Sequence, residues 1–206
     1  MNTREELRGA LAGRRIEALV IGGSAGGVDA LANLLPALPR ACSLPVICIL
    51  HIPGDRESRL AELFGARLPL PVREAADKEE IAPGTVYFAG SGYHLSVERD
   101  RSFSLSCEAP VAFARPAIDV LMTSAADAYG PGLAGVLLTG ANHDGAEGMA
   151  AIHAGGGLTV VQDPRDAQVP TMPQEALRRF TPHLVLPLAD IGALLPLLAQ
   201  LDTEES

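Results

Sequence analysis

The sequence predicts an α/β fold, with a doubly wound, mostly parallel sheet, helices on both of its faces and an antiparallel hairpin at its edge. Short apolar runs alternate with stretches of helical periodicity along most of the 206 residues, and this alternation is typical of parallel sheets. Several of the runs are continuously apolar, as expected of strands buried on both faces. A chain of this length usually forms one domain and can bury a core without disulfides or metal.

The apolar runs and the stretches between them give the expected order of elements. We expect strands at Ala18–Ile21, Val46–Leu50, Thr85–Ala89, Leu133–Thr139 and Leu158–Gln162. Apolar residues recur at helical spacing in the expected helices Val28–Leu35, Glu57–Ala66, Ile118–Tyr129, Ala146–Ala154 and Asp190–Leu201. Tyr93–Val97 and Phe103–Cys107 alternate apolar and polar residues around a charged stretch, which predicts a hairpin at the sheet edge with one face exposed to water.

No internal repeat or long linker divides the chain, so residues 16–201 are predicted to form one domain. Residues 1–15 form an N-terminal extension with room for a short helix at most, and residues 202–206 are expected to fray. The extension mixes acidic and basic residues and lacks the apolar stretch of a signal peptide. No apolar run approaches the ~18 residues of a membrane span. We therefore expect a cytoplasmic protein.

Composition excludes some classes of function. Hydrophobic residues make up 48% of the chain, which argues against disorder. The formal net charge of -9 disfavours a nucleic-acid partner, because phosphate backbones bind basic surfaces. The cysteines show no CxxC spacing, and Cys48 lies in an apolar run as a buried free thiol would. His143 with Asp144, and His153 with Asp163, lack the ligand spacing of a metal site, so we expect neither a metal nor another cofactor.

The turn Gly22–Gly27 is the first candidate for chemistry, because it follows a predicted strand and opens a predicted helix. Ser24 occupies the middle glycine of the dinucleotide pattern GxGxxG, and Val28 and Asp29 replace the Lys and Ser/Thr of a P-loop. The form G-x-S-x-G does fit. A tight turn would push a nucleophilic Ser24 out of the sheet edge, and the backbone N–H of Ala25 would face a developing oxyanion. The alternative is that Ser24 only caps the helix.

His51 and Asp144 also follow predicted strands, at the edge where ligands gather in parallel sheets. The chain has five histidines, and a single histidine is usually structural, but His51 ends an apolar run much as Ser24 does. Asp144 has a structural alternative, because Asp144 and Glu147 resemble a capping box at a helix start. An aspartate held there could also accept the Nδ1–H of a histidine.

A serine, a histidine and an aspartate at one sheet edge are the set that acyl transfer needs: a nucleophile, a base, and a carboxylate that orients the base. Their order along the chain differs from the Ser…Asp/Glu…His order of the α/β-hydrolases, so that fold is not implied. The sequence therefore predicts a serine hydrolase with Ser24, His51 and Asp144 in these roles.

The sequence resembles the catalytic domain of the chemotaxis protein-glutamate methylesterases over residues 16–201. The motifs that carry the resemblance are Gly22–Gly27 for Gly-Ala-Ser-Thr-Gly-Gly, Leu50–Ile52 for Gln-His-Met, Leu138–Gly145 for Leu-Thr-Gly-Met-Gly-x-Asp-Gly, Arg115–Leu121, Gln162–Pro164 and Met172–Ala176. The chain departs from the family with Ala25 in place of Thr, Leu50 in place of Gln and Ala141 in place of Met.

The resemblance implies that Ser24 attacks the methyl ester of a receptor glutamate, with His51 as base and Asp144 orienting it. The backbone N–H groups of Ala25 and Ala141 would form the oxyanion site. Methanol leaves, and water then frees the enzyme. Family members can also deamidate receptor glutamines at the same site. The implied partner is a methylated chemoreceptor or a related sensory protein.

Two alternatives stay open on the sequence alone. One is an esterase of the same fold with another protein or ester substrate, and the other is a degenerate member that binds signalling proteins without turnover. Family members normally carry an N-terminal receiver domain of roughly a hundred residues, whereas residues 1–15 precede the predicted domain here. We expect either a stand-alone member or a shortened chain. Its activity would be constitutive or controlled by a separate regulatory protein, and small phosphodonors would not change it.

Overall fold

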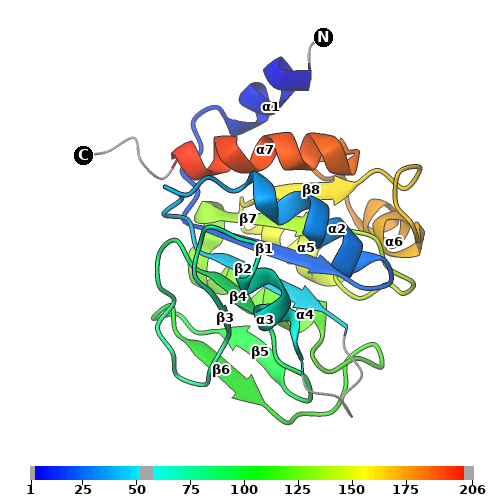
Figure 1. Ribbon diagram of the computed structural model, residues 1–206. Coiled ribbons are helices and arrows are strands. Elements are labelled where there is room, and N and C mark those ends of the chain that lie inside the picture. The colour runs from blue at the N-terminus through cyan, green and yellow to red at the C-terminus, as the bar shows by residue number, and fades with distance from the viewer. Residues whose placement is uncertain (1–2, 52–57, 202–206) are drawn as a thin grey trace.

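The computed structural model describes residues 3–51 and 58–201 (Figure 1). The predicted frayed tail 202–206 and the start of the predicted helix at Glu57 lie outside the described residues. The strands are β1 (Ala18–Gly23), β2 (Val46–Leu50), β3 (Val72–Glu74), β4 (Val86–Phe88), β5 (His94–Val97), β6 (Phe103–Ser106), β7 (Leu133–Leu137), β8 (Leu158–Gln162) and β9 (Leu184–Leu186). The helices are α1 (Thr3–Leu11), α2 (Gly27–Leu34), α3 (Leu60–Gly65), α4 (Ile118–Tyr129), α5 (Ala146–Ala154), α6 (Thr171–Arg179) and α7 (Leu188–Leu201), with short 3₁₀ helices at Leu35–Ala37 and Gly130–Gly132.

Seven strands form one sheet in the order β3-β4-β2-β1-β7-β8-β9. β1 lies between β2 and β7, and each pairing within this sheet is parallel. The chain builds outward from β1 in both directions, and helices cover both faces of the sheet (Figure 1). The predicted doubly wound α/β fold is confirmed.

The side chains of the central strands contribute to two separate hydrophobic cores, because successive side chains of a strand point to opposite faces of the sheet. Leu19 and Ile21 of β1 pack with leucines of α2 and α7 on one face. Ala18 and Val20 pack on the other face with apolar side chains of α4 and α5. Burial on both sides explains why the strand sequences are continuously apolar rather than alternating.

The N-terminal extension forms α1, which matches the short helix that its length allowed. Leu7 and Leu11 are buried in the core that α7 lines. An isolated helix of this length is only marginally stable in water. Burial of its apolar surface, which stabilises by about 25 cal/mol per Å², holds the helix against the domain.

The predicted hairpin is present as β5 and β6, but its position differs from the prediction. It forms its own two-stranded antiparallel sheet and does not pair with the edge of the large sheet. Its β5 strand lies against α4, where the backbone N–H of Val97 donates to the hydroxyl of Ser124 at 3.1 Å. Leu95 and Phe103 are fully buried in the α4–α5 core. Helix α4 therefore covers the apolar face of the hairpin, whereas Ser96 and Ser104 on the opposite face are half-exposed, as predicted.

Strands β3 and β9 and helix α6 were not predicted from the sequence. Both strands are three residues long, too short to show a periodic pattern, and they lie at the two edges of the sheet. Helix α6 contains Pro173 in its first turn, where proline needs no hydrogen-bonded N–H but looks like a breaker in the sequence. Among the described residues, no helix is long and apolar enough to cross a membrane.

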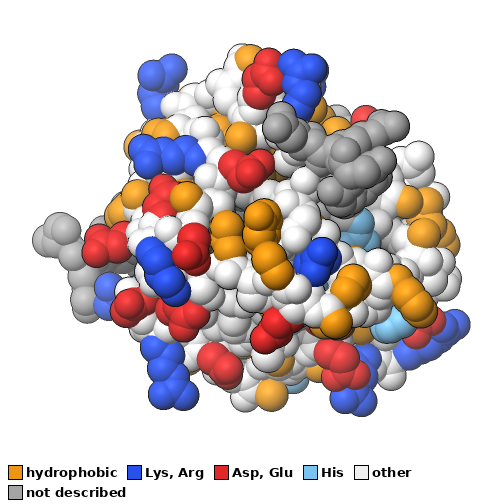
Figure 2. All heavy atoms as spheres, turned by 90° about the horizontal axis from the view of Figure 1, so that it is seen from below, with side chains coloured by type: hydrophobic (Ala, Val, Ile, Leu, Met, Phe, Trp, Pro, Cys, Tyr) orange, Lys and Arg blue, Asp and Glu red, His pale blue; other side chains and the backbone are white. Residues whose placement is uncertain are grey.

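Acidic and basic side chains are interspersed on the face of the molecule seen in Figure 2. No continuous basic area is visible on that face, in keeping with the formal net charge of -9.

Helices α4 and α5 approach closely at Gly148. A Cβ atom on Gly148 would lie 2.5 Å from the Cβ of Met122 and 3.2 Å from the Cα of Asp119. Both neighbours belong to α4, and neither atom can rotate away. A glycine in the first turn of α5 therefore sets the distance between the two helices that reach the sheet edge next to Ser24, His51 and Asp144.

We predict that Gly148→Ala destabilises the protein by about 1–3 kcal/mol through overpacking, despite the better helix propensity of alanine. Gly192→Ala is the matched control, because it lies in α7 and a Cβ atom there meets nothing within 4 Å. That substitution should leave stability unchanged or raise it by up to about 1 kcal/mol. Urea unfolding of both variants measures the difference, and equal stabilities would show that the α4–α5 contact tolerates a methyl group.

Candidate active site

Ser24 and His51 follow directly on neighbouring strands. The parallel register pairs Gly23 of β1 with Leu50 of β2, so the next residues, Ser24 and His51, lie side by side at the carboxyl edge of the sheet. The chain then turns through Gly26, which has a left-handed φ of 80° and is the N-cap of α2. No side chain caps this helix. The alternative interpretation of Ser24 as a helix cap is therefore wrong.

Thr139 fixes the turn that carries Ser24. Its backbone oxygen accepts the N–H of Ser24 at 2.9 Å, and its hydroxyl lies 2.9 Å from the carbonyl oxygen of Ala25. The same hydroxyl accepts the N–H of Val169 at 2.8 Å, and the Thr139 N–H donates to Gln162 at 2.9 Å. Sequence reasoning placed Thr139 at a strand end and gave it no role, although it stands in the Leu-Thr-Gly motif.

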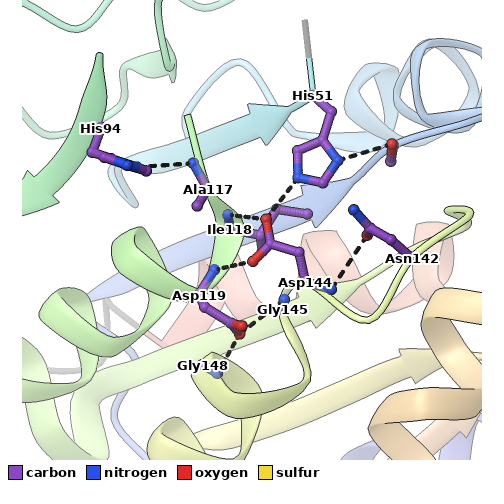
Figure 3. A network of polar contacts seen from close by, with 10 residues as sticks. His51, His94, Ala117, Ile118, Asp119, Asn142, Asp144, Gly145 and Gly148 are labelled. Carbon is purple, nitrogen blue, oxygen red and sulfur yellow. Dashed lines mark hydrogen bonds and ion pairs between the residues drawn. The ribbon is translucent and has the colours of Figure 1, made fainter. Parts of the chain in front are cut away.

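The imidazole of His51 lies between Ser24 and Asp144. Its Nδ1 is 3.1 Å from Ser24 Oγ, and its Nε2 is 2.7 Å from Asp144 Oδ2 (Figure 3). An ionised carboxylate only accepts hydrogen bonds, so Nε2 carries the proton and the lone pair of Nδ1 faces the serine hydroxyl. The side chain of His51 is 16% exposed and that of Asp144 is fully buried.

The expectation that Asp144 accepts the Nδ1–H of a histidine was wrong about the nitrogen. Ser24 follows the strand next to β2, whereas Asp144 follows β7, which is one strand further away. The nitrogen nearer the backbone therefore reaches the nearer strand, and the distal nitrogen reaches the aspartate.

The carboxylate of Asp144 binds the start of α4 as well as His51. Its Oδ2 accepts the N–H of Ile118 at 2.7 Å, and its Oδ1 accepts the N–H of Asp119 at 2.8 Å. These groups belong to the first turn of a helix, which carries unpaired N–H donors and partial positive charge. The side chain of Asp144 therefore caps α4, although Asp144 itself does not belong to that helix.

The predicted capping box at the start of α5 does not form. The N-cap of α5 is Gly145, with a left-handed φ of 98° and no side-chain cap. Glu147 points to Arg179, with which it forms an ion pair of 2.7 Å. The pattern Asp-x-x-Glu was misread because a carboxylate from α4, far away in the sequence, takes the capping position.

That carboxylate belongs to Asp119. Its Oδ1 accepts the N–H groups of Gly145 and Gly148, both at 2.8 Å. Each of the two aspartates therefore receives backbone N–H groups from the start of the other's helix, as the dashed lines in Figure 3 show. Asp119 was not singled out from the sequence, where it appears as an ordinary acidic residue in the first turn of a helix.

The pKa values of Asp144 and Asp119 are shifted in opposite directions. Burial disfavours ionisation of Asp144, but the hydrogen bonds from His51 and from the N–H groups of Asp119 and Ile118 outweigh it and lower its pKa. Burial raises the pKa of Asp119 to about 6, with a contribution from the negative charge of Asp144, against the hydrogen bonds from Gly148 and Gly145. Asp144 is therefore the ionised partner of His51 at neutral pH.

The loop before α5 exposes further polar groups beside the serine. Ala25 and Ala141 are both exposed, and no acceptor for their backbone N–H groups is recorded among the described residues. Asn142 accepts the N–H of Asp144 through Oδ1 at 3.2 Å. This orients the Asn142 amide nitrogen toward the side of the loop on which His51 lies (Figure 3). Asn142 was another residue that the sequence analysis passed over.

His94 and His183 have partners other than Ser24. His94 is buried and bonds backbone groups with both nitrogens, at Ala117 and Ala109. His183 bonds Thr159 and Arg14, and its ring lies 4.9 Å from that of His153. In the described ranges, no three His, Cys, Asp or Glu side chains gather as a metal site would require. The thiol of Cys48 is buried, and burial raises its pKa.

Comparison with known proteins identifies the family. The family model of the CheB methylesterases matches residues 19–195. The chain belongs to the CheB methylesterase family. The crystal structure of the Thermotoga maritima CheB methylesterase catalytic domain is similar, with a TM-score of 0.83 and 30% sequence identity over 90% of this chain and 98% of the other.

Two curated members of the CheB family differ in how much of their length this chain spans. A putative protein-glutamate methylesterase/protein-glutamine glutaminase from Leptospira interrogans (serovar copenhageni) is 41% identical over 92% of this chain and 98% of the relative. The protein-glutamate methylesterase FrzG from Myxococcus xanthus is 40% identical over 86% of this chain, but the match spans 53% of FrzG. The family resemblance expected from the sequence motifs is confirmed.

We predict that Asp119 makes stability depend on pH between about 4 and 6. The pKa of Asp119 is raised to about 6 in the folded protein, above the ordinary value of about 3.9, so the folded state holds a proton that the unfolded state releases. The resulting stabilisation is complete below the ordinary value and is lost as the pH rises through about 6. The lowered pKa of Asp144 acts in a lower window, because its contribution is lost only as the pH falls below the ordinary value.

Urea unfolding of the wild type and Asp119→Asn at several pH values tests this. The wild type should lose stability relative to the variant as the pH rises from about 4 to 7. Asp127→Asn is the control, because Asp127 is an exposed carboxylate on the same helix. A difference between wild type and Asp119→Asn that is independent of pH would mean that Asp119 titrates as it does in the unfolded chain.

Proposed function

We propose that this protein is a protein-glutamate methylesterase that uses Ser24, His51 and Asp144 as a catalytic triad. The observation that carries the proposal is the continuous hydrogen-bonded path from Ser24 Oγ through the His51 ring to Asp144, with steps of 3.1 and 2.7 Å. Such a path lets the imidazole take the hydroxyl proton while the carboxylate stabilises the imidazolium that forms. The names of the Leptospira and Myxococcus relatives supply the substrate class.

The proposed reaction proceeds through an acyl-enzyme. Ser24 Oγ attacks the ester carbonyl carbon, and its proton passes to His51 Nδ1. The N–H groups of Ala25 and Ala141 receive the developing oxyanion, and the exposure of both residues supports this role. The intermediate expels the methoxy group, which takes the proton from His51 and leaves as methanol. Water then attacks the acyl group, with His51 again as base, and frees a glutamate side chain and Ser24.

The open surroundings of the serine support a protein substrate. Ser24 is half-buried, and Ala25, Val28 and Asp29, which follow it in the chain, are exposed. Ala141 and His143 are also exposed, in the loop after Thr139, whose backbone oxygen accepts the N–H of Ser24. An ester on a side chain displayed by another protein can reach such a site. We propose a methylated chemoreceptor or a related sensory protein as that partner, which implies a cytoplasmic location for the enzyme.

Deamidation of glutamine is a second proposed activity of the same site. The name of the Leptospira relative includes protein-glutamine glutaminase. A glutamine side chain forms the same acyl-enzyme, with ammonia as the leaving group in place of methanol. A degenerate binding module is less well supported, because the three side chains keep hydrogen-bonding distances that a binding surface does not need.

We predict that Ser24→Ala and His51→Ala each reduce methanol release from methylated receptor membranes by about a thousandfold or more. Each should keep the wild-type fold, because neither side chain caps a helix or enters a core. The double variant should be little worse than either single variant, since members of a triad act as a unit. Additive losses in the double variant, or methanol release unaffected by Ser24→Ala, would contradict the assignment.

We predict that Asp144→Asn lowers both activity and stability. An amide has one acceptor oxygen, whereas Asp144 uses both oxygens to accept N–H groups from Ile118, Asp119 and His51. In the variant one N–H donor faces an NH₂ group, which lowers the stability of the fold by about 1–3 kcal/mol. Turnover should fall by up to about 10⁴-fold, because the imidazolium loses its charged partner. Methanol release and urea unfolding, with Asp127→Asn as control, measure the two effects. Full activity would remove Asp144 from the mechanism.

A further inference from the structure

We propose that Asp119 is a positioning residue, whose side chain holds the carboxylate of Asp144 against His51 by binding the backbone that follows Asp144. The inference rests on the proposed function and extends it to a fourth side chain. Asp119 touches neither Ser24 nor His51 among the recorded contacts, so its action passes through Asp144.

The peptide unit that follows Asp144 belongs to a glycine. Gly145 follows Asp144 directly and takes the left-handed φ of 98°. A side chain there would collide with Leu137 at 2.6 Å and Ile118 at 2.9 Å, so glycine is required. Glycine loses more conformational freedom on folding than any other residue. The carboxylate that lies 2.7 Å from His51 is therefore followed by a residue without a side chain, so contacts to its backbone N–H bear directly on the position of Asp144.

Asp119 supplies such contacts from α4. Its Oδ1 holds the N–H of Gly145, the next residue after Asp144, and the N–H of Gly148 one turn into α5, both at 2.8 Å. Its own backbone N–H donates to Asp144 Oδ1 at 2.8 Å. One residue therefore contacts both the carboxylate of Asp144 and the peptide unit that follows it. Figure 3 shows the two aspartates facing each other between the starts of the two helices.

No other charged group takes over this role in the part of the chain that the structure describes. Glu147, on the first turn of α5, is directed to Arg179. His94, on β5, bonds the backbone of Ala117 and Ala109. The charged neighbour of Asp119 is Asp144 itself, and His51 lies beyond it.

The substitution series Asp119→Asn, Asp119→Ser and Asp119→Ala separates the hydrogen bonds from the charge. Asparagine keeps an acceptor oxygen at the place of Oδ1 and removes the charge. Alanine removes both, and serine offers an acceptor that is too short to reach both N–H groups. Asp127→Ala is the matched control, because it removes an exposed carboxylate from the same helix. Stability of each variant is measured alongside, and Asp119→Ser replaces Asp119→Ala if the latter does not fold.

We expect Asp119→Ala to lower kcat for methanol release by about ten- to a hundredfold with little change in KM, because misplacement of a catalytic group by about 1 Å can cost up to about a hundredfold. Asp119→Asn should stay within about threefold of the wild type, and Asp127→Ala should match it. A loss in Asp119→Asn as large as in Asp119→Ala would overturn the proposal in favour of a charge effect. Wild-type kcat in both Asp119→Ala and Asp119→Ser would overturn it altogether.

A spectroscopic readout keeps this test independent of the methylesterase assignment. The Nε2 proton of His51, hydrogen-bonded to Asp144, is followed by NMR in the wild type and in each variant. We expect the signal to persist in Asp119→Asn and to broaden or move upfield in Asp119→Ala. A signal unchanged in Asp119→Ala would refute positioning even if the protein released no methanol. Absence of methanol release from the wild type would refute the proposed function alone.

Discussion

The buried carboxylate of Asp144 is the group on which the geometry of the site depends. It is fully buried, and a buried charge is costly unless hydrogen bonds replace the lost water. Here the replacements come from the first turn of α4 and from His51, at 2.7–2.8 Å. The same contacts that make the charge tolerable also fix where it lies. Removing the carboxylate would leave the buried N–H group of Ile118 without this acceptor, at a cost in stability.

The two helices of this site are joined by a reciprocal arrangement rather than by two separate caps. Asp144 precedes α5 and binds the start of α4, and Asp119 in α4 binds the start of α5. The exchange is possible only because α4 and α5 come close at Gly148, where a larger residue would collide with Met122. The packing of α4 against α5 and the orientation of Asp144 at the sheet edge therefore depend on the same contacts.

The serine is held by different means. Ser24 sits on a turn whose backbone is bonded to Thr139, and Thr139 also reaches Ala25 and Val169. His51 connects this rigid turn to the aspartate pair, and the parallel register of β1 and β2 brings it beside Ser24. The half-buried Ser24, the proposed nucleophile, therefore lies beside a histidine whose position is already fixed, which suits the protein-bound ester proposed as substrate.

The sequence by itself determined the fold class, the main strands and helices, and the choice of Ser24, His51 and Asp144 as candidates, because those features depend on local patterns and on strand ends. Only the tertiary structure decided which nitrogen of His51 faces which partner, that the hairpin packs under α4, and that Asp119 rather than a local capping box binds the start of α5. The physical reason is that these contacts join residues 25 to 93 positions apart, and hydrogen bonds between distant segments leave no periodic trace in a single sequence. The local sequence pattern suggested that Asp144 caps α5. In the structure Asp119 binds the start of α5 instead, because α4 and α5 pack closely together.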